Sequence, residues 1–404
     1  MNIDQIRKDS PVTAHYAYFD TGAAAPPPLS VLNAVIEYLK KTAELGIYLP
    51  SLRKEIYANV EQIHADMALF LGAEPPEIAF TKNATESICV IAQGIDWQAG
   101  DEVIVPDTEI LSNLSPWLRL EKTRGIKVIH AKANSEGLLE TAHIEQLITP
   151  KTRLLTFGSL SNATGALQDA KSLCSLAKKH GILSLVNASQ SLGLVETNVR
   201  DLDCDFLAGC GRKGLRAIEG TGILYVRNSL IDTLEPCLIG WWNSSIDPQT
   251  QELILPNTAK RFEAGCPNVP AILSLGAALK YATALEMPKI QARVDHLTRY
   301  AVTALSSIIG FTLYGPLDAS KRIGLIPFNI IGKENDCIDP NLLVTMLEKN
   351  GVIIEAGHFM AHAIMQKYQI ERMARISLHY FNTEEEIDKT VDLIKNFILT
   401  YSAS

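Results

Sequence analysis

One lysine, Lys213, lies between two segments that are typical of buried strands, at residues 204–210 and 222–226. Lysine is seldom buried unless it is ion-paired or has a function. The alternative interpretation of Lys213 is an ordinary surface lysine at the end of a strand. Burial and the neighbouring cation Arg212 would lower the pKa of the Lys213 amine. A neutral amine can form a Schiff base with an aldehyde cofactor, so this position predicts a reactive lysine.

Three further loops carry polar side chains that could bind a ligand near such an amine. Residues 83–86 (Asn-Ala-Thr-Glu) begin a predicted helix, and its free backbone N–H groups and positive dipole end suit a phosphate. The same residues are also an ordinary start of a helix. Residues 161–165 (Ser-Asn-Ala-Thr-Gly) and 187–190 (Asn-Ala-Ser-Gln) each follow a predicted strand. Taken singly, each loop is typical of a turn.

The elements that must position these loops alternate between strands and helices. Short β-branched runs at 102–105, 126–129, 153–157 and 183–186 are interleaved with helical patterns at 83–93, 140–147 and 170–180. This alternation predicts an α/β fold with a mostly parallel sheet and helices on both of its faces. A ligand of such a sheet binds beyond the carboxyl ends of the strands, where the loops lie.

After Pro267 the pattern changes to longer helices, at 271–285 and 289–309, followed by a strand at 325–330 and a last amphipathic helix at 384–399. These elements are typical of a smaller α/β domain. We therefore expect a large cofactor-binding domain of residues 17–265. Residues 1–16 and 266–404 would form the small domain with the N-terminal segment.

The composition limits the class of partner. The 404 residues carry a formal net charge of −8 and contain no basic run with interleaved aromatic residues, which argues against nucleic acid. No segment reaches membrane-spanning length and the first residues lack a signal-peptide pattern, so we expect a cytoplasmic protein that acts on small molecules. Seven scattered cysteines without a CxxC pair predict reduced thiols. His358 and His362 alone have metal-ligand spacing, and no metal site is expected.

The order and spacing of the four loops resemble those of the pyridoxal-phosphate enzymes of fold type I. Within them, the chain is similar to the class V aminotransferase group, which includes cysteine desulfurases and selenocysteine lyases. The resemblance runs from residues 18–24 (Tyr-Phe-Asp-Thr-Gly-Ala-Ala) to 375–386 (Arg-Ile-Ser-Leu-His-Tyr-Phe-Asn-Thr-Glu-Glu-Glu). It implies a pyridoxal 5′-phosphate cofactor, an amino-acid substrate and a homodimer.

The resemblance also implies a role for individual residues. Lys213 would be the catalytic lysine that holds the cofactor. Ala84, Thr85, Cys210 and Arg212 would lie at the cofactor phosphate, and Cys266 would reach the phosphate of the neighbouring subunit. Asn162 and Gln190 would lie at the phenolate oxygen, and Ile110 and Asn187 at the ring. Arg375 would bind the substrate α-carboxylate through a bidentate pair, with Ala23, Glu355 and His358 nearby.

Two departures from the family pattern concern the cofactor ring. Asn187 stands where relatives carry an aspartate that keeps the ring nitrogen protonated, and a neutral amide cannot stabilise that charge. Ile110, in the segment Glu109–Asn113, stands where relatives place a histidine or another aromatic residue over the ring. Both changes weaken the predicted electron sink.

Other departures concern the substrate and the phosphate. Met360 replaces the nucleophilic cysteine of desulfurases and has no ionisable proton with which to form a persulfide. Glu355 replaces an arginine and disfavours a second anionic group on the substrate. Cys210 and Cys266 replace hydroxyl residues on the phosphate side, which predicts a reduced affinity for the cofactor.

The favoured prediction is a cofactor-dependent enzyme in which Lys213 takes the Cα proton of an amino acid and a β-substituent leaves, as in a C–S lyase. A sulfur leaving group or a racemase-like proton exchange is easier than transamination when the ring is poorly protonated. Two alternatives remain open: an aminotransferase, and a weakened or non-catalytic member of the family with a binding or regulatory role. The sequence predicts that the chain is not a true cysteine desulfurase.

Overall fold

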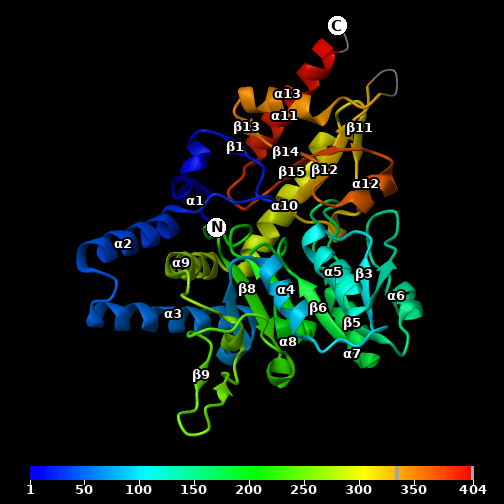
Figure 1. Ribbon diagram of the computed structural model, residues 1–404. Helices are drawn as coiled ribbons and strands as arrows, with labels where there is room; N and C mark the ends of the chain where they lie inside the picture. Colours follow the sequence, from blue (N-terminus) through cyan, green and yellow to red (C-terminus); the bar gives the residue numbers. More distant parts are fainter. Residues whose placement is uncertain (333–335, 402–404) are drawn as a thin grey trace.

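The structure is a computed structural model that describes residues 1–332 and 336–401. A seven-stranded sheet forms the centre of the larger part of the molecule, with the strand order β2-β8-β7-β6-β5-β3-β4 (Figure 1). Its strands are β2 (Ile78–Thr81), β3 (Glu102–Pro106), β4 (Lys127–Ala131), β5 (Thr152–Gly158), β6 (Leu183–Asn187), β7 (Phe206–Cys210) and β8 (Gly222–Val226). The pairs from β4 to β7 are parallel, whereas β8 is antiparallel to both β7 and β2. The predicted mostly parallel sheet is confirmed.

Helices cover both faces of this sheet because consecutive strand residues point to opposite sides. Val103 packs in a core with α4 (Ala84–Gly94) and α5 (Ser115–Arg124), whereas its neighbour Ile104 packs in the core on the other face. That second core includes α3 (Pro50–Leu71), α6 (Thr141–Leu147), α7 (Ala170–Lys179), α8 (Val199–Leu202) and α9 (Val269–Leu285). Both residues are fully buried, so the near-continuous apolar strands follow from a sheet covered on two sides.

A second, antiparallel sheet lies in the upper part of Figure 1, with the order β11-β12-β15-β14. Its strands are β11 (Phe311–Leu313), β12 (Leu325–Ile330), β14 (Glu355–Gly357) and β15 (Met373–Ser377). The helices α10 (Met287–Leu305), α11 (Pro340–Lys349) and α13 (Glu384–Tyr401) pack against it. This arrangement contains the helices predicted at 289–309 and 384–399 and the strand predicted at 325–330, whereas the helix predicted at 271–285 is α9 and packs against the large sheet. The short helix α12 (His362–Tyr368) packs beside β15, and α1 (Ile3–Lys8) buries Ile6 in the core of the larger part.

Several contacts cross the predicted domain boundary at residues 265–266. β1 (Ala17–Tyr18) pairs with β13 (Val352–Ile353), and α9 packs against both α2 (Leu29–Leu45) and α3. Figure 1 shows α2 and α3 extending together to the left, and the β9–β10 hairpin (Ser245–Ile246 and Leu253–Ile254) projecting below. Elements on each side of the predicted boundary at residues 265–266 therefore contact the other part. The division into two domains stays a prediction.

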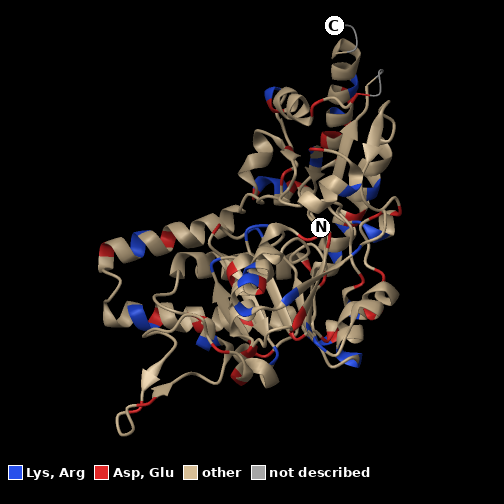
Figure 2. Ribbon diagram, turned by 45° about the vertical axis from the view of Figure 1, so that its right-hand side comes forward, with Lys and Arg blue, Asp and Glu red and all other residues tan. Residues whose placement is uncertain are grey.

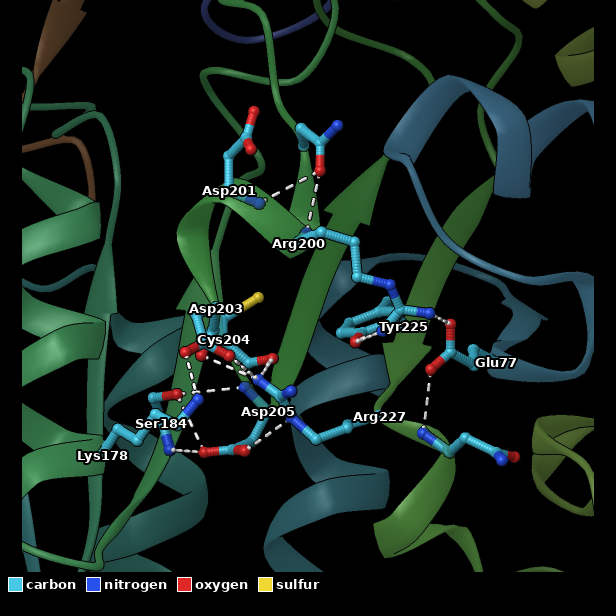
Figure 3. A network of polar contacts seen from close by, with 12 residues as sticks. Glu77, Lys178, Ser184, Arg200, Asp201, Asp203, Cys204, Asp205, Tyr225 and Arg227 are labelled. Carbon is cyan, nitrogen blue, oxygen red and sulfur yellow. Dashed lines mark hydrogen bonds and ion pairs between the residues drawn. The ribbon is translucent and has the colours of Figure 1, made fainter.

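A polar network fixes the amino-terminal ends of β6 and β7 (Figure 3). Arg227 binds Asp203 at 2.8 Å and Asp205 at 3.0 Å, and Asp205 also accepts the backbone N–H of Ser184 at 2.9 Å. These residues precede or begin the strands, whereas Lys213 follows the end of β7. The network thus stabilises the end of the sheet that is opposite to the loops of interest.

Acidic and basic side chains are interspersed over both parts of the molecule (Figure 2). Within the described residues, none of the helices combines the length and the apolar character that crossing a bilayer requires.

Candidate active site

A cavity with an empty volume of about 650 Å³ opens to solvent beyond the carboxyl ends of β5, β6 and β7 and at the first turn of α4. The structure places in its wall every residue predicted to contact the cofactor except Cys266: Ala84, Thr85, Ile110, Asn162, Asn187, Gln190, Cys210, Arg212 and Lys213. The chain thus brings these residues together, and the role of each one stays a prediction.

Lys213 lies in the loop between β7 and β8 with 8% of its surface exposed. Within the described parts of the chain, its Nζ atom has no hydrogen-bond or ion-pair partner. The pKa of Lys213 is lowered to about 8, chiefly by burial; the charges of Arg212 and Arg375 act in the same direction, and those of Cys210 and Glu355 oppose it. A buried amine without a partner, partly neutral near pH 8, fits the covalent attachment of an aldehyde cofactor.

The loop that carries Lys213 is held by a buried arginine that was not among the predicted site residues. Arg216 is fully buried at a φ of +63° and donates its backbone N–H to the carbonyl of Lys213 at 3.0 Å. Its guanidinium donates to the carbonyl of Pro26 at 2.9 Å and to the hydroxyl of Ser10 at 2.8 Å. Gly214 is needed between them, since a Cβ there would lie 2.4 Å from a backbone oxygen of Leu192. A non-glycine residue at positive φ carries no sequence signal, so reasoning from sequence missed this anchor.

The first turn of α4 supplies donors for a phosphate. Asn83 caps the helix by accepting the backbone N–H of Glu86 at 2.9 Å, which leaves the N–H groups of Ala84 and Thr85 without partners in the described residues. The guanidinium of Arg212 lines the same cavity. Two free N–H groups at a helix N-terminus beside an arginine suit a phosphate dianion, as the sequence predicts.

The Asn187 side chain is held in one orientation inside the cavity. Its Oδ1 atom accepts the backbone N–H of Ser189 at 3.2 Å and the Ser189 hydroxyl at 2.5 Å. Since a backbone N–H can only donate, the atom that faces it must be the amide oxygen. The free group of this amide is therefore Nδ2, a hydrogen-bond donor.

Glu109 is a buried carboxyl group in the cavity wall that was not among the predicted site residues. Burial raises the pKa of Glu109 to about 7, although hydrogen bonds from Asn113 and Gly158 oppose the shift. The Gly158 N–H donates to Oε1 at 2.5 Å and the Asn113 amide donates to Oε2 at 2.9 Å. The cavity thus contains a group that titrates near neutral pH. The sequence signal was an acidic residue three positions after the end of the buried strand β3.

Other polar residues of the wall had no predicted role. Asn83, Ser161 and Ser189 lie in the loops singled out from the sequence, whereas Thr108 and Ser112 were missed because they are common turn residues.

Arg375, predicted to bind a substrate carboxylate, adjoins the cavity but is already ion-paired. Only 2% of its surface is exposed, and Nη1 donates to the carbonyl of the cavity residue Asn162 at 3.0 Å. Nη2 lies 2.5 Å from Oε2 of Glu355 and 3.3 Å from Oδ1 of Asp20. Burial raises the pKa of Asp20 to about 6, against the effect of Arg375. The structure thus places predicted Arg375 and Glu355 in one cluster.

The remaining predicted substrate residues lie around this cluster. The carbonyl of Ala23 accepts a hydrogen bond from Arg212. His358 accepts the backbone N–H of Met360 at 3.1 Å, and its ring lies 4.5 Å from that of His362. Among the described residues, no group of three metal-ligating side chains forms around these histidines or elsewhere.

Two predicted cofactor contacts have partners within the protein. The amide of Asn162 donates to the carbonyl of Phe359 at 2.7 Å, and the amide of Gln190 donates to the carbonyl of Gly22 at 3.0 Å. Cys266 lies in a separate hollow, lined also by Lys82, Glu86 and Gly220. Its predicted contribution to the phosphate of a neighbouring subunit stays a prediction.

Residues 17–390 match the family model described as aminotransferase class-V. The chain belongs to this family. A probable cysteine desulfurase of Methanothermobacter thermautotrophicus is 34% identical over 392 residues, which cover 96% of each chain. A cysteine desulfurase of Pectobacterium carotovorum is 32% identical over 407 residues, again 96% of each chain. An apo structure of a cysteine desulfurase from Thermococcus onnurineus superposes with a TM-score of 0.91 at 30% identity and covers 98% of each chain.

These comparisons establish the fold type I architecture and the pyridoxal 5′-phosphate cofactor of this class-V enzyme. Our expectation that the chain is not a true cysteine desulfurase receives no support from them, since the relatives carry that name.

Proposed function

We propose that this class-V enzyme cleaves the Cβ–S bond of a sulfur-containing amino acid by β-elimination, which yields a thiol, pyruvate and ammonium after the addition of water. The single observation that carries the proposal is the position of Lys213. This unpartnered, buried amine with a lowered pKa shares a cavity with a phosphate-binding helix end.

Lys213 is the general base for this reaction. When bound, pyridoxal 5′-phosphate supplies the carbonyl group that takes up the substrate amine and withdraws electrons from Cα. Arg375 orients the substrate through its α-carboxylate, and Lys213 removes the Cα proton with its Nζ atom. A pKa lowered to about 8 increases the fraction of the neutral amine, which is the form that accepts the proton. The first turn of α4 and Arg212 hold the phosphate end.

Met360 supports elimination rather than desulfuration. It stands in the loop position where the resemblance implies a nucleophilic cysteine, and the backbone N–H of Leu111 binds its carbonyl at 3.0 Å. A thioether cannot take the sulfur atom as a persulfide, because it has no proton to lose. The sulfur therefore leaves as a thiol or thiolate, and this distinguishes the chain from a true cysteine desulfurase.

Asn187 supports the same choice. Its Nδ2 donor suits an unprotonated ring nitrogen, which weakens the stabilisation of a carbanion at Cα. Loss of a good leaving group shortens the time for which that charge must be stabilised, whereas aminotransfer requires it to persist. Elimination is therefore the favoured outcome over aminotransfer.

We also propose a cytoplasmic homodimer. All seven cysteines are free, which fits a reducing compartment. The resemblance implies that the partner subunit receives the Gly265–Asn268 segment near its own phosphate site.

The experiment is to purify the protein with its cofactor, treat it with borohydride and map the modified peptide. We expect a yellow protein whose cofactor becomes attached to Lys213. Incubation with an S-alkyl cysteine or with L-cysteine should then release pyruvate together with an equal amount of thiol or of hydrogen sulfide, respectively. A protein that stays colourless after addition of the cofactor would refute the proposal, and alanine formed in place of pyruvate would indicate a desulfurase.

A further inference from the structure

The ion-paired state of Arg375 bears on which substrates the site accepts. β14 and β15 are antiparallel, and their register places Glu355 directly opposite Arg375. Cross-strand pairs of opposite charge stabilise such sheets, so the 2.5 Å contact between the two side chains is built into the fold. Glu355 therefore occupies one edge of the guanidinium to which the proposed function assigns the substrate carboxylate.

The rest of the guanidinium is closely surrounded. Phe359 stacks on it, with Cζ 4.2 Å from the ring centre, and a Cβ on Gly22 would lie 3.0 Å from the same atom. Within the described residues, its Nε atom is buried without a hydrogen-bond partner. Asp20 is also in contact, at 3.3 Å. Arg375 thus has an unused donor but little room to move, and a substrate must adapt to the cluster as it stands.

The charges of the cluster disfavour a substrate that carries an anionic group in addition to its α-carboxylate. One arginine faces two carboxylates, Asp20 and Glu355, and a substrate α-carboxylate adds a third negative group. The Glu355 side chain is 39% exposed, whereas that of Asp20 is 17% exposed, so Glu355 is the carboxylate that a bound molecule can reach. A cation carried by the substrate would offset the excess negative charge.

We propose that Glu355 is a specificity-determining residue that selects sulfur-containing amino acids with a cationic group on the far side of the sulfur. Substrates with a carboxylate in that position are disfavoured. The proposal rests on the proposed function for the placement of the substrate α-carboxylate at Arg375. It adds the class of leaving group, which is a thiol with an amino group.

The test compares three ligands of similar size: S-(2-aminoethyl)-L-cysteine, S-(carboxymethyl)-L-cysteine and the neutral S-ethyl-L-cysteine. Their affinities for the holoenzyme are measured by calorimetry, and pyruvate release is measured separately. We expect the aminoethyl compound to bind roughly tenfold more tightly than the carboxymethyl compound, as expected when a partly exposed ion pair is exchanged for a repulsion. Wild-type protein that binds the carboxymethyl compound equally well or better would overturn the proposal.

Variants assign the effect to Glu355. Glu355→Gln should reduce the affinity ratio to about two, and Glu355→Arg should reverse it. The matched control is Glu371→Gln, which alters an exposed carboxylate just before β15 and should leave the ratio unchanged. An unchanged ratio in Glu355→Gln would overturn the proposal. If no ligand releases pyruvate but the affinities follow this pattern, the lyase function is wrong and the role of Glu355 stands.

Discussion

Ser189 donates two hydrogen bonds to one atom of Asn187, its Oδ1, at 2.5 Å from the hydroxyl and 3.2 Å from the backbone N–H. Turning the amide over would lose the bond from the backbone N–H, which can only donate. Asn187 therefore keeps its Nδ2 donor free in a cavity where the resemblance implies a carboxylate acceptor.

The first prediction concerns Asn187→Asp. The carboxylate keeps the two bonds from Ser189 and presents a second oxygen to the cofactor, which stabilises a protonated ring. We expect the exchange of the substrate Cα proton with deuterated water to accelerate about tenfold, equivalent to about 1.4 kcal/mol of barrier. NMR measures the exchange. An unchanged or slower rate would mean that the chemistry is adapted to an unprotonated ring.

A second prediction concerns the stability of the cofactor-free protein. Burial lowers the pKa of Lys213 from 10.5 to about 8, so below pH 8 the folded state contains a disfavoured cation. Lys213→Met removes this cost, which amounts to at most about 3 kcal/mol near pH 6.5.

The gain should fall as the pH rises from 8 toward 10.5, where the wild-type lysine is neutral when folded but still charged when unfolded. At pH 10 we expect under about 1 kcal/mol. Thermal unfolding at both pH values measures the effect, with Lys171→Met on the exposed side of α7 as the control. A gain that is the same at both pH values would contradict a lowered pKa.

A third prediction tests the phosphate site. Thr85→Val keeps the shape of the side chain but removes its hydroxyl at the first turn of α4. The loss of a hydrogen bond to a charged group should weaken binding of pyridoxal 5′-phosphate by about tenfold or more. Binding of pyridoxal, which has no phosphate, should be unchanged, and equilibrium dialysis with both compounds measures this. Equal losses for both would place Thr85 away from the phosphate.

A fourth prediction is that Met360→Cys alone does not create a desulfurase. Its side chain is 51% exposed, at a φ of +56°, and Glu355 still places a negative charge in the same loop. A negative charge disfavours the thiolate that desulfuration requires. Mass spectrometry of the variant after incubation with cysteine should show no added sulfur atom on the protein. Appearance of that adduct would show that Met360 is the only barrier.

Much of this architecture could be predicted from periodicity alone. The predicted strand at 183–186 is β6, at residues 183–187, and the predicted helix at 170–180 is α7, at residues 170–179. Such elements have regular patterns because each strand is buried on two faces and each helix on one. Loops at the carboxyl ends of parallel strands must meet at one edge of the sheet. For this reason the sequence alone could predict that the residues around Lys213 lie close together.

The sequence by itself determined the residue types of the site: the lysine, the helix start at Ala84, and the replacements Asn187 and Met360. Only the tertiary structure decided their state. The near-neutral pKa of Glu109 and the pairing of Arg375 with Glu355 depend on neighbours from other strands, whereas the orientation of the Asn187 amide depends on how the chain turns at Ser189. Hydrogen bonds and desolvation act through distances in space, and the spacing of residues along the chain does not contain those distances.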